Sequence, residues 1–431
     1  MLTTKYARDH IQEIVDSLKK RKSQYPINEL LKLDEDWRKL KTDLQGLQAR
    51  RNKESLEIAQ LKKANGDITA KVAELGKVKE GIAAIEAELP TYEARIEQLL
   101  WNMPNALHDT VPYGESSEQN VTLRKWGDIK KTSSPGHEEI LTKLGLLDVE
   151  RAAKVAGARF YYLKGDMALL EQSLIRFALD TLTKKGYTVV APPYMLKKKY
   201  YKGVTALGDF EDALYRIGDP NEVEAKAEYE KVGEDLFLIS TSEHAMAAMH
   251  AEELFNGSQL PLRYAGISMC FRREAGAHGK DTKGMFRVHQ FYKVEQFIFS
   301  KQDDSWGYFD ELIGNAEEIF QKLNIPYRVV EICTGDIGTV AARKNDIEAW
   351  MPSQGDYREV VSCSNCTDWQ GVRLDIKYDD KGERKYVHTL NSTAVATTRA
   401  LVAIVENYAN EDGSITVPDV LVPYMGKAKI G

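Results

Sequence analysis

The sequence predicts an α+β fold, in which a large, mostly antiparallel sheet with packed helices follows an N-terminal antiparallel α-helical coiled-coil hairpin. The hairpin is predicted by two stripes of apolar residues, at alternating spacings of three and four, on either side of a turn signal. The sheet is predicted because short β-prone segments beyond about residue 135 adjoin one another more often than they alternate with helices.

Composition sets the broad class of protein. A chain of 431 residues with 43% hydrophobic residues is long enough for two or three domains. Its net charge of −6 gives no global attraction to nucleic acid, so such a partner has to meet a local basic patch. The N-terminal segment has no apolar stretch typical of a signal peptide, and no uncharged apolar run is long enough to span a bilayer.

The cysteines indicate the redox environment. Four are too few for a disulfide framework and fit a reducing compartment, so we expect a cytoplasmic protein without a membrane partner. Cys363 and Cys366 have the spacing of a zinc-binding pair, but no two further ligands stand at a suitable distance. Structural thiols are the favoured interpretation, and no zinc is expected. His244 and His250 form no metal motif either.

The hairpin is expected to begin near residue 30 and to reverse at residues 64–67, where Asn and Gly tolerate a turn. The first stripe is interrupted at Arg51 and Glu54, and the second contains Pro90, which should kink or split its helix. The first stripe consists of Leu30, Leu33, Trp37, Leu40, Leu44, Leu47, Ile58 and Leu61, and the second of Val78, Ile82, Ile85, Leu89, Tyr92, Ile96 and Leu99.

A dimerisation or spacer coil is the plain interpretation of such a hairpin, and composition alone favours it. The turn lies in the middle, however, so the chain folds back on itself instead of seeking a partner. Residues 50–79, nearest the tip, carry eight Lys or Arg against four Asp or Glu. This local positive bias favours contact with phosphates, although charge runs are often only a solvated face.

A linker is expected at residues 106–135, between an N-terminal domain at 1–105 and a second domain at 136–431. Helices are predicted in the second domain at 166–185, 303–323 and 394–409. Strands are predicted at 187–191, 236–240, 262–272, 290–300, 327–333, 358–364 and 385–391. The stretch at 218–234 is interpreted as a solvated acidic insertion.

Charged residues are unusually frequent in two predicted strands, 262–274 and 286–300, which a Gly-rich loop at 275–284 joins. Arg272, Glu274 and Glu295 stand among apolar residues, and charges are costly to bury unless they are compensated. The loop lacks the order of residues that makes a P-loop. Cations beside carboxylates on a strand pair suit a zwitterion and a polyphosphate.

These segments resemble a known family. Residues 271–274 and 287–295 resemble motif 2 of the class II aminoacyl-tRNA synthetases, Pro193 resembles the motif 1 proline, and residues 389–399 resemble motif 3. Within the class, the chain is most similar to the seryl-tRNA synthetases, which share an N-terminal hairpin, a Thr-x-Glu element (residues 241–243) and a segment like residues 357–366. The likeness extends over nearly the whole chain.

The resemblance implies a serine–tRNA ligase that uses ATP and Mg²⁺. It would form seryl-adenylate and then transfer serine to the 3′ end of tRNA(Ser), which the hairpin and the motif 2 loop would hold. Motif 1 implies a homodimer. By the same resemblance Arg272, Glu359 and Arg399 are catalytic, and Glu359 and Ser362 hold Mg²⁺. Serine is expected to contact Thr241, Glu243, Arg272, Glu295, Asn391 and Thr393. ATP is expected to contact Arg272, Glu274, Arg287, Val288, Phe291, Glu359, Val360, Val361, Ser362 and Arg399.

One motif departs from the family, and two other functions stay open. Motif 3 usually has two glycines where this chain has Thr393 and Val395, which makes a close backbone approach to ATP less easy. The alternatives are a synthetase-like ligase that charges a carrier protein, and a non-enzymatic coiled-coil protein on a decayed synthetase scaffold. The retained hairpin argues against the first, and the intact charged residues argue against the second.

Overall fold

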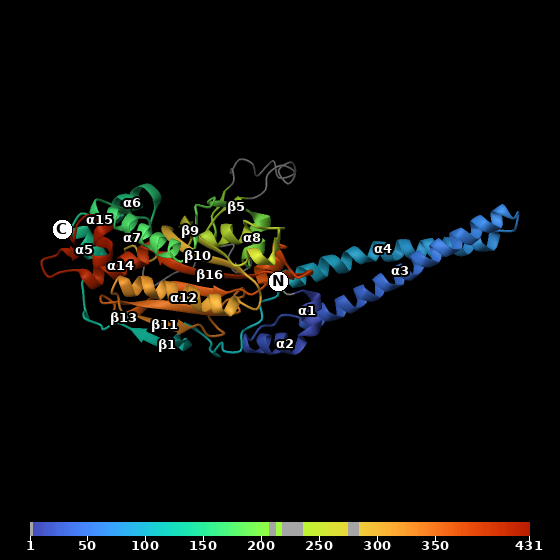
Figure 1. The fold of residues 1–431 in the computed structure, drawn as a ribbon, viewed down its shortest axis with the longest axis horizontal. Coiled ribbons are helices and arrows are strands. Elements are labelled where there is room, and N and C mark those ends of the chain that lie inside the picture. Colours follow the sequence, from blue (N-terminus) through green and yellow to red (C-terminus); the bar gives the residue numbers. More distant parts are fainter. Residues whose placement is uncertain (1–2, 207–212, 218–235, 275–283) are drawn as a thin grey trace. The chain divides into compact units, whose positions relative to one another are not determined.

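The computed structural model describes residues 3–206, 213–217, 236–274 and 284–431. Within the chain, two compact units are distinguished, Met1–Ala106 and Leu107–Gly431 (Figure 1). The predicted acidic insertion at 218–234 and all but the last residue of the predicted loop at 275–284 lie outside the described residues.

The first unit contains the predicted helical hairpin. Two short helices, α1 (Thr4–Asp9) and α2 (Ile11–Lys20), precede two long ones, α3 (Ile27–Lys63) and α4 (Thr69–Asn102). The predicted turn lies in the short connection between the long helices. Helix α4 is continuous through Pro90, so the prediction that this proline splits the helix is wrong.

Both predicted stripes face one another along the hairpin. Leu44 on α3 packs with Val78, Ile82 and Leu89 on α4, with Trp37, Leu40, Leu47 and Ile85 at the margin of this cluster. The interruption of the first stripe also has a structural explanation. Glu54 is buried, and the Arg50 guanidinium lies 2.5 Å from its carboxylate, so a charge pair one turn apart replaces the missing apolar contact.

The second unit is a mixture of strands and shorter helices. Its α-helices are α5 (His137–Lys143), α6 (Val149–Ala156), α7 (Asp166–Thr183), α8 (Lys198–Val204), α11 (Ser242–Ala248), α12 (Ser305–Lys322), α13 (Trp369–Arg373), α14 (Thr397–Tyr408) and α15 (Val422–Met425). The strands of its main sheet are β1 (Val121–Trp126), β4 (Thr188–Val190), β9 (Leu262–Phe271), β10 (Gln290–Ser300), β11 (Tyr327–Glu331), β12 (Arg343–Met351), β13 (Asp356–Asn365) and β16 (His388–Ala396).

These eight strands run in the order β1-β11-β12-β13-β16-β10-β9-β4. Every neighbouring pair is antiparallel except β4 and β9, which are parallel. Small sheets add β2 (Leu147–Asp148), β3 (Tyr162–Leu163), β5 (Met195–Lys197), β6 (Arg216–Ile217), β7 (Leu236–Leu238), β8 (Leu254–Asn256), β14 (Lys377–Asp380), β15 (Glu383–Tyr386), β17 (Ile415–Thr416) and β18 (Lys429–Ile430). The predicted antiparallel α+β fold is therefore confirmed.

Strand alternation separates a core face of the sheet from a polar face. On β10 the Gln296 amide donates to the Leu312 carbonyl of α12 and accepts from Asn315, so the even-numbered side chains face this helix. On β13 the Cys363 thiol likewise contacts the Phe309 carbonyl of α12. Residues one step away, including Glu295 and Ser362, therefore face the other side of the sheet.

Three of the observed strands differ from the predictions of local structure. Strand β12 was not predicted, because its charged residues break the apolar pattern. Strand β1 lies inside the predicted linker and pairs with β11 at one edge of the sheet. Strand β16 continues to Ala396, three residues into the predicted helix at 394–409. Strand β10 (Gln290–Ser300) matches the predicted strand at 290–300, and residues 286–289, which the wider span 286–300 included, lie before it.

Candidate active site

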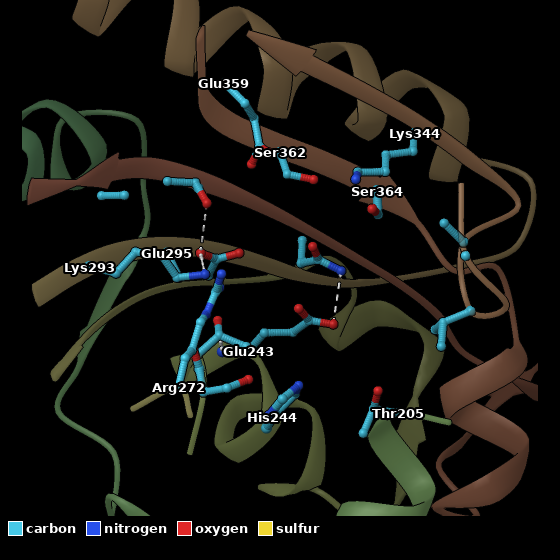
Figure 2. A pocket seen from close by; sticks show the side chains of 18 of the residues that line it. Thr205, Glu243, His244, Arg272, Lys293, Glu295, Lys344, Glu359, Ser362 and Ser364 are labelled. Carbon is cyan, nitrogen blue, oxygen red and sulfur yellow. Dashed lines mark hydrogen bonds and ion pairs between the residues drawn. The ribbon is translucent and has the colours of Figure 1, made fainter. Parts of the chain in front are cut away.

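A cavity of about 440 Å³ lies on the polar face of the sheet, where β10, β13 and β16 meet α11 (Figure 2). It is lined by every residue that the sequence predicted to bind substrate, apart from Val361. The side chain of Val361 belongs to the hydrophobic core, since the alternation of β13 turns it to the opposite face. Pro193, the predicted motif 1 residue, lies between β4 and β5 and not at this cavity.

One end of the cavity carries the Thr-x-Glu element. Thr241 caps α11, and its hydroxyl accepts the backbone N–H of Glu243 at 3.2 Å. The Glu243 carboxylate accepts hydrogen bonds from the amides of Gln370 and Asn391, both at 3.1 Å. Burial, followed by the nearby charge of Glu295, raises the pKa of Glu243 to about 7.

A second buried carboxylate lies beside it. Glu295 accepts a hydrogen bond from the Thr393 hydroxyl at 3.3 Å and forms an ion pair with Lys293 at 2.5 Å. Both side chains of this ion pair are less than 10% exposed. Burial raises the pKa of Glu295, while the ammonium of Lys293 opposes the shift. Glu243, Lys293 and Glu295 project toward the same space in Figure 2.

Arg272 lies at the end of β9, between the carboxylates and the aromatic part of the cavity. Its guanidinium carbon is 5.2 Å from the centre of the Phe291 ring, and its Nε is 3.5 Å from the Ser240 carbonyl. Nearby, the Arg287 guanidinium donates to the Glu274 carboxylate at 2.5 Å. Glu274 has a φ of +48°, which is unusual for a residue other than glycine and turns the chain sharply after the strand.

The other end of the cavity is more open and contains an exposed ion pair. The Arg399 guanidinium, in the first turn of α14, lies 3.0 Å from the Glu359 carboxylate, whose side chain is 47% exposed. Loss of hydration acts to raise the pKa of Glu359, but the charges of Arg399, Lys344 and Arg272 outweigh it and lower that pKa. The Phe286 ring lies beside two guanidinium groups, at 4.8 Å from Arg358 and 5.2 Å from Arg399.

Oxygen ligands suited to a divalent cation gather near Glu359. Ser362 lies opposite Asp346 in the pairing of β13 with β12, and the Asp346 carboxyl is buried. Burial raises the pKa of Asp346, and no hydrogen-bond partner among the described residues reaches its Oδ1 atom. Carboxylate and hydroxyl oxygens are the ligands that Mg²⁺ accepts, so this donor set fits the predicted ion.

Several residues that line the cavity were missed by the sequence reasoning, among them Lys293, Phe286 and Lys344. A signal for Lys293 was present, because it stands two residues before Glu295 and therefore on the same face of its strand. For Lys344 the signal depended on β12, which was not predicted. His244 is buried and contacts the Tyr201 hydroxyl, and burial lowers its pKa to about 3.

The cysteines lie inside the protein. All four are buried and free of disulfides, and the Cys366 thiol lies 3.7 Å from the Asn391 amide. In the described parts of the chain, no group of three or more His, Cys, Asp or Glu residues could hold a metal ion. A Mg²⁺ ion here would therefore need substrate oxygens to complete its coordination, in addition to Asp346, Glu359 and the Ser362 hydroxyl. Mg²⁺ usually binds in this way beside phosphates.

The main sheet is mostly antiparallel, and its cavity has one end lined by arginines and another lined by carboxylates. Comparison with family models gives the class of protein. Residues 225–408 match a family model described as tRNA synthetase class II core domain (G, H, P, S and T), so the fold is that of a class II aminoacyl-tRNA synthetase. Residues 1–107 match the model of the seryl-tRNA synthetase N-terminal domain.

Whole-chain comparisons narrow the class to one family. A serine–tRNA ligase of Methanoculleus marisnigri is 49% identical over 99% of both chains. Seryl-tRNA synthetase from Pyrococcus horikoshii, solved in complex with ATP, superimposes with a TM-score of 0.93 at 44% identity over 100% of this chain and 99% of that one. Cytoplasmic serine–tRNA ligase from Naegleria fowleri, in complex with AMP, gives a TM-score of 0.86 at 39% identity, covering 97% and 95% of the two chains. The chain belongs to the seryl-tRNA synthetase family.

The membership agrees with the predicted ligase class and with the predicted helical hairpin. The missing motif 3 glycines do not remove the chain from the family. Thr393 and Val395 stand in β16, and an irregularity in its pairing with β10 falls between them. As regards membranes, a helix both long and apolar enough to cross one is not found in the described part of the chain.

Proposed function

We propose that this chain joins L-serine to tRNA(Ser) in two steps, with ATP as the source of energy. The serine carboxylate attacks the α-phosphorus of ATP, forming seryl-adenylate and releasing pyrophosphate. A terminal ribose hydroxyl of the tRNA then attacks the carbonyl carbon and releases AMP. The observation that carries the proposal is the division of a single cavity into a carboxylate end for a small ammonium compound and an arginine end for phosphates.

Arg272 is proposed to bridge the two reacting groups. Its guanidinium lies between Phe291 and the carboxylate end, where it can hold the serine carboxylate and an α-phosphate oxygen. The adenine ring would stack on Phe291 and contact Val288 and Val360, while Glu274 accepts from its amino group and Arg287 orients Glu274. Arg399 would contact the γ-phosphate. These groups act by positioning the reactants and by neutralising charge.

Glu359 and Ser362 are proposed to hold Mg²⁺, which would neutralise phosphate charge. Asp346 stands behind them as a buried carboxylate, and the ion pair of Glu359 with Arg399 keeps the Glu359 carboxylate ionised for this role. The nearby charge of Glu359 adds to burial in raising the pKa of Asp346.

Serine is proposed to bind at the carboxylate end. Its ammonium would meet Glu243 and the Thr241 region, and its hydroxyl would meet Glu295 and Thr393, with Asn391 closing the site through its contact with Glu243. Alanine in the same place would leave the buried polar groups of Glu295 and Thr393 without a partner, at a cost of about 1–3 kcal/mol.

The N-terminal domain, taken as residues 1–105, is proposed to bind tRNA(Ser) through the hairpin, with residues 106–135 as connection and 136–431 as the catalytic domain. Support comes from the family of the N-terminal domain and from the basic residues near the hairpin tip. Replacing Lys62, Lys63 and Lys77 with Gln should lower kcat/KM for tRNA and flatten its salt dependence, with amino-acid activation unchanged. An equal loss of activation would contradict this role.

A homodimer is proposed from the motif 1 resemblance around Pro193. Sedimentation at working concentration should give twice the chain mass, and a clean monomer would contradict the proposal. The proposed function as a whole is tested by ATP–pyrophosphate exchange with each of the twenty amino acids, followed by charging of tRNA. Serine should give the highest kcat/KM, and a carrier-protein ligase would show exchange without transfer to tRNA.

A further inference from the structure

A buried histidine outside the cavity connects two of the cavity's walls. His137, the first residue of α5, has a side chain that is 10% exposed. Its Nδ1 atom lies 3.1 Å from the Glu406 carboxylate on α14. Its Nε2 atom accepts the backbone N–H of Met285 at 3.1 Å.

These contacts determine the state of the imidazole ring. Because a backbone N–H can only donate, Nε2 has to be unprotonated, and the ring proton therefore sits on Nδ1 and is donated to Glu406. Glu406 is itself held in place, since it also accepts the backbone N–H groups of His137 at 3.2 Å and of Ser353 at 3.1 Å. The side chain of Glu406 is fully buried.

Gly284 makes the close approach possible. Its φ of +69° belongs to the left-handed region, and a Cβ atom added there would lie 2.2 Å from His137 Nε2. The chain at residue 284 is thus shaped around the imidazole ring, and any side chain at this position would push the ring away from Met285.

Both ends of the connection lead into the cavity. Met285 is followed directly by Phe286 and Arg287, and the Phe286 ring contacts the Arg399 guanidinium. Arg399 and Glu406 stand seven residues apart on α14, which places them on the same side of the helix. His137 therefore attaches the segment that carries Phe286 to the helix that carries Arg399.

We infer that His137 is a positioning residue for nucleotide binding: through Met285 N–H and Glu406 it sets Phe286 and Arg287 in register with Arg399 at the phosphate end of the cavity. The inference rests on the proposed activation of serine with ATP. The carboxylate end is built from Glu243, Glu295 and Asn391 on other elements, so loss of His137 should affect ATP and leave serine binding unchanged.

Two substitutions of His137 test its hydrogen bonds with Met285 and Glu406 separately. In His137→Asn the amide can still reach Glu406 but is too short for Met285, whereas in His137→Gln the amide oxygen can still accept from Met285 N–H. Loss of that hydrogen bond should raise the KM for ATP in pyrophosphate exchange about tenfold in His137→Asn. The KM for serine should stay within about twofold. His137→Gln loses the contact with Glu406 instead, so it breaks the same connection and should also raise the KM for ATP without raising that for serine.

A third variant tests the contact between His137 and Met285 by a change at Gly284 instead of at the histidine. Gly284→Ala leaves the imidazole ring intact but displaces it, so it should raise the KM for ATP in the same selective way. Thermal unfolding of each variant tests whether the protein is folded. If His137→Asn does not fold, the Gly284→Ala variant decides.

The outcomes distinguish this inference from the proposed function. A wild-type protein without serine-dependent exchange contradicts the proposed function itself. Exchange in the wild type, with an unchanged KM for ATP in the His137→Asn and Gly284→Ala variants or with KM raised equally for serine and ATP, would overturn the positioning role of His137 alone.

Discussion

The two ends of the cavity hold their carboxylates in different ways. At the amino-acid end, Glu243 and Glu295 are enclosed by neutral amides, a hydroxyl and a single buried ammonium, and the pKa of each carboxyl is raised. At the phosphate end, the half-exposed Glu359 is paired with Arg399, and its pKa is lowered. Glu295 on β10 and Glu359 on β13 thus line the same cavity, yet the pKa of one carboxyl is raised and that of the other is lowered.

The difference follows from what each end has to recognise. A small zwitterion is distinguished by a few short hydrogen bonds, which are strongest where water is excluded. A triphosphate carries several charges and keeps part of its hydration, so guanidinium groups at a more open surface suit it better. The amino-acid end should therefore respond to pH and to loss of single hydrogen bonds, and the phosphate end to changes of charge.

The most damaging substitution should be Arg272→Ala, which removes the cation shared by both ends. Glu243, Glu295 and Glu359 would each lose a compensating charge, and the reacting groups would lose their bridge. We expect serine-dependent exchange to fall about a thousandfold or more in kcat/KM. Arg272→Lys should recover only part of the loss, because one ammonium cannot hold two oxygen pairs. Near-normal kinetics in the Ala variant would refute the assignment of Arg272.

Glu359→Gln tests the exposed end alone. We expect activation to fall about a hundredfold at low Mg²⁺ and to recover in part as Mg²⁺ is raised, since a neutral amide is a weaker ligand. Unfolding free energy should change by less than about 0.5 kcal/mol, because the side chain is half-exposed. Titration of exchange activity with Mg²⁺ measures the effect, and a loss that is independent of Mg²⁺ would argue against a ligand role.

Serine binding should depend on pH through the buried end. The free protein holds Glu243 with a pKa of about 7, and the serine ammonium favours the ionised carboxylate, so binding releases a proton below that pH. The dissociation constant for serine should therefore decrease about tenfold between pH 6 and pH 8 and level off above. Calorimetry without ATP measures it. Glu243→Gln should bind serine weakly and without this dependence, and a pH-independent wild type would refute the proposed partner of the ammonium.

Thr393→Ala should have the smallest effect and the most selective one. Its hydroxyl donates to Glu295, and its loss removes one polar group that alanine as a substrate would leave unsatisfied. The ratio of kcat/KM for serine over alanine should fall about fivefold, equivalent to about 1 kcal/mol. Thr393→Ser serves as the matched control, because it keeps the hydroxyl. If the ratio is unchanged in the Ala variant, selectivity lies elsewhere in the site.

Much of this fold could be predicted from the sequence because its periodic signals are strong. The apolar stripes predicted the hairpin, and even their interruption at Glu54 could be located, although not its ion pair with Arg50. Pro90 does not split α4 as predicted, because a proline on the exposed side of a long helix that is already stabilised by packing does not end it. The site residues came from the resemblance, and all of those predicted to bind substrate, apart from Val361, line the cavity.

Strand β12, and the cavity residue that lies on it, could not be predicted from the sequence for a physical reason. Lys344 and Asp346 would be expected on a surface, yet they lie in an interior strand, where Lys344 lines the cavity and forms an ion pair with Asp346. Strand β1 is an exposed edge strand, so its sequence does not contain the pattern of apolar residues that a buried strand would need. Contacts such as that between His137 and Met285 join positions 148 residues apart and leave no local pattern at all.

The alternation of β10 limits how this protein can change over evolutionary time. Lys293 and Glu295 line the cavity, whereas Val294 and Gln296 beside them face the core against α12, so inserting or deleting one residue in this part of the strand would exchange the two sets. A new amino-acid preference could therefore arise here by replacement at single positions, whereas length variation has to be confined to the connecting loops.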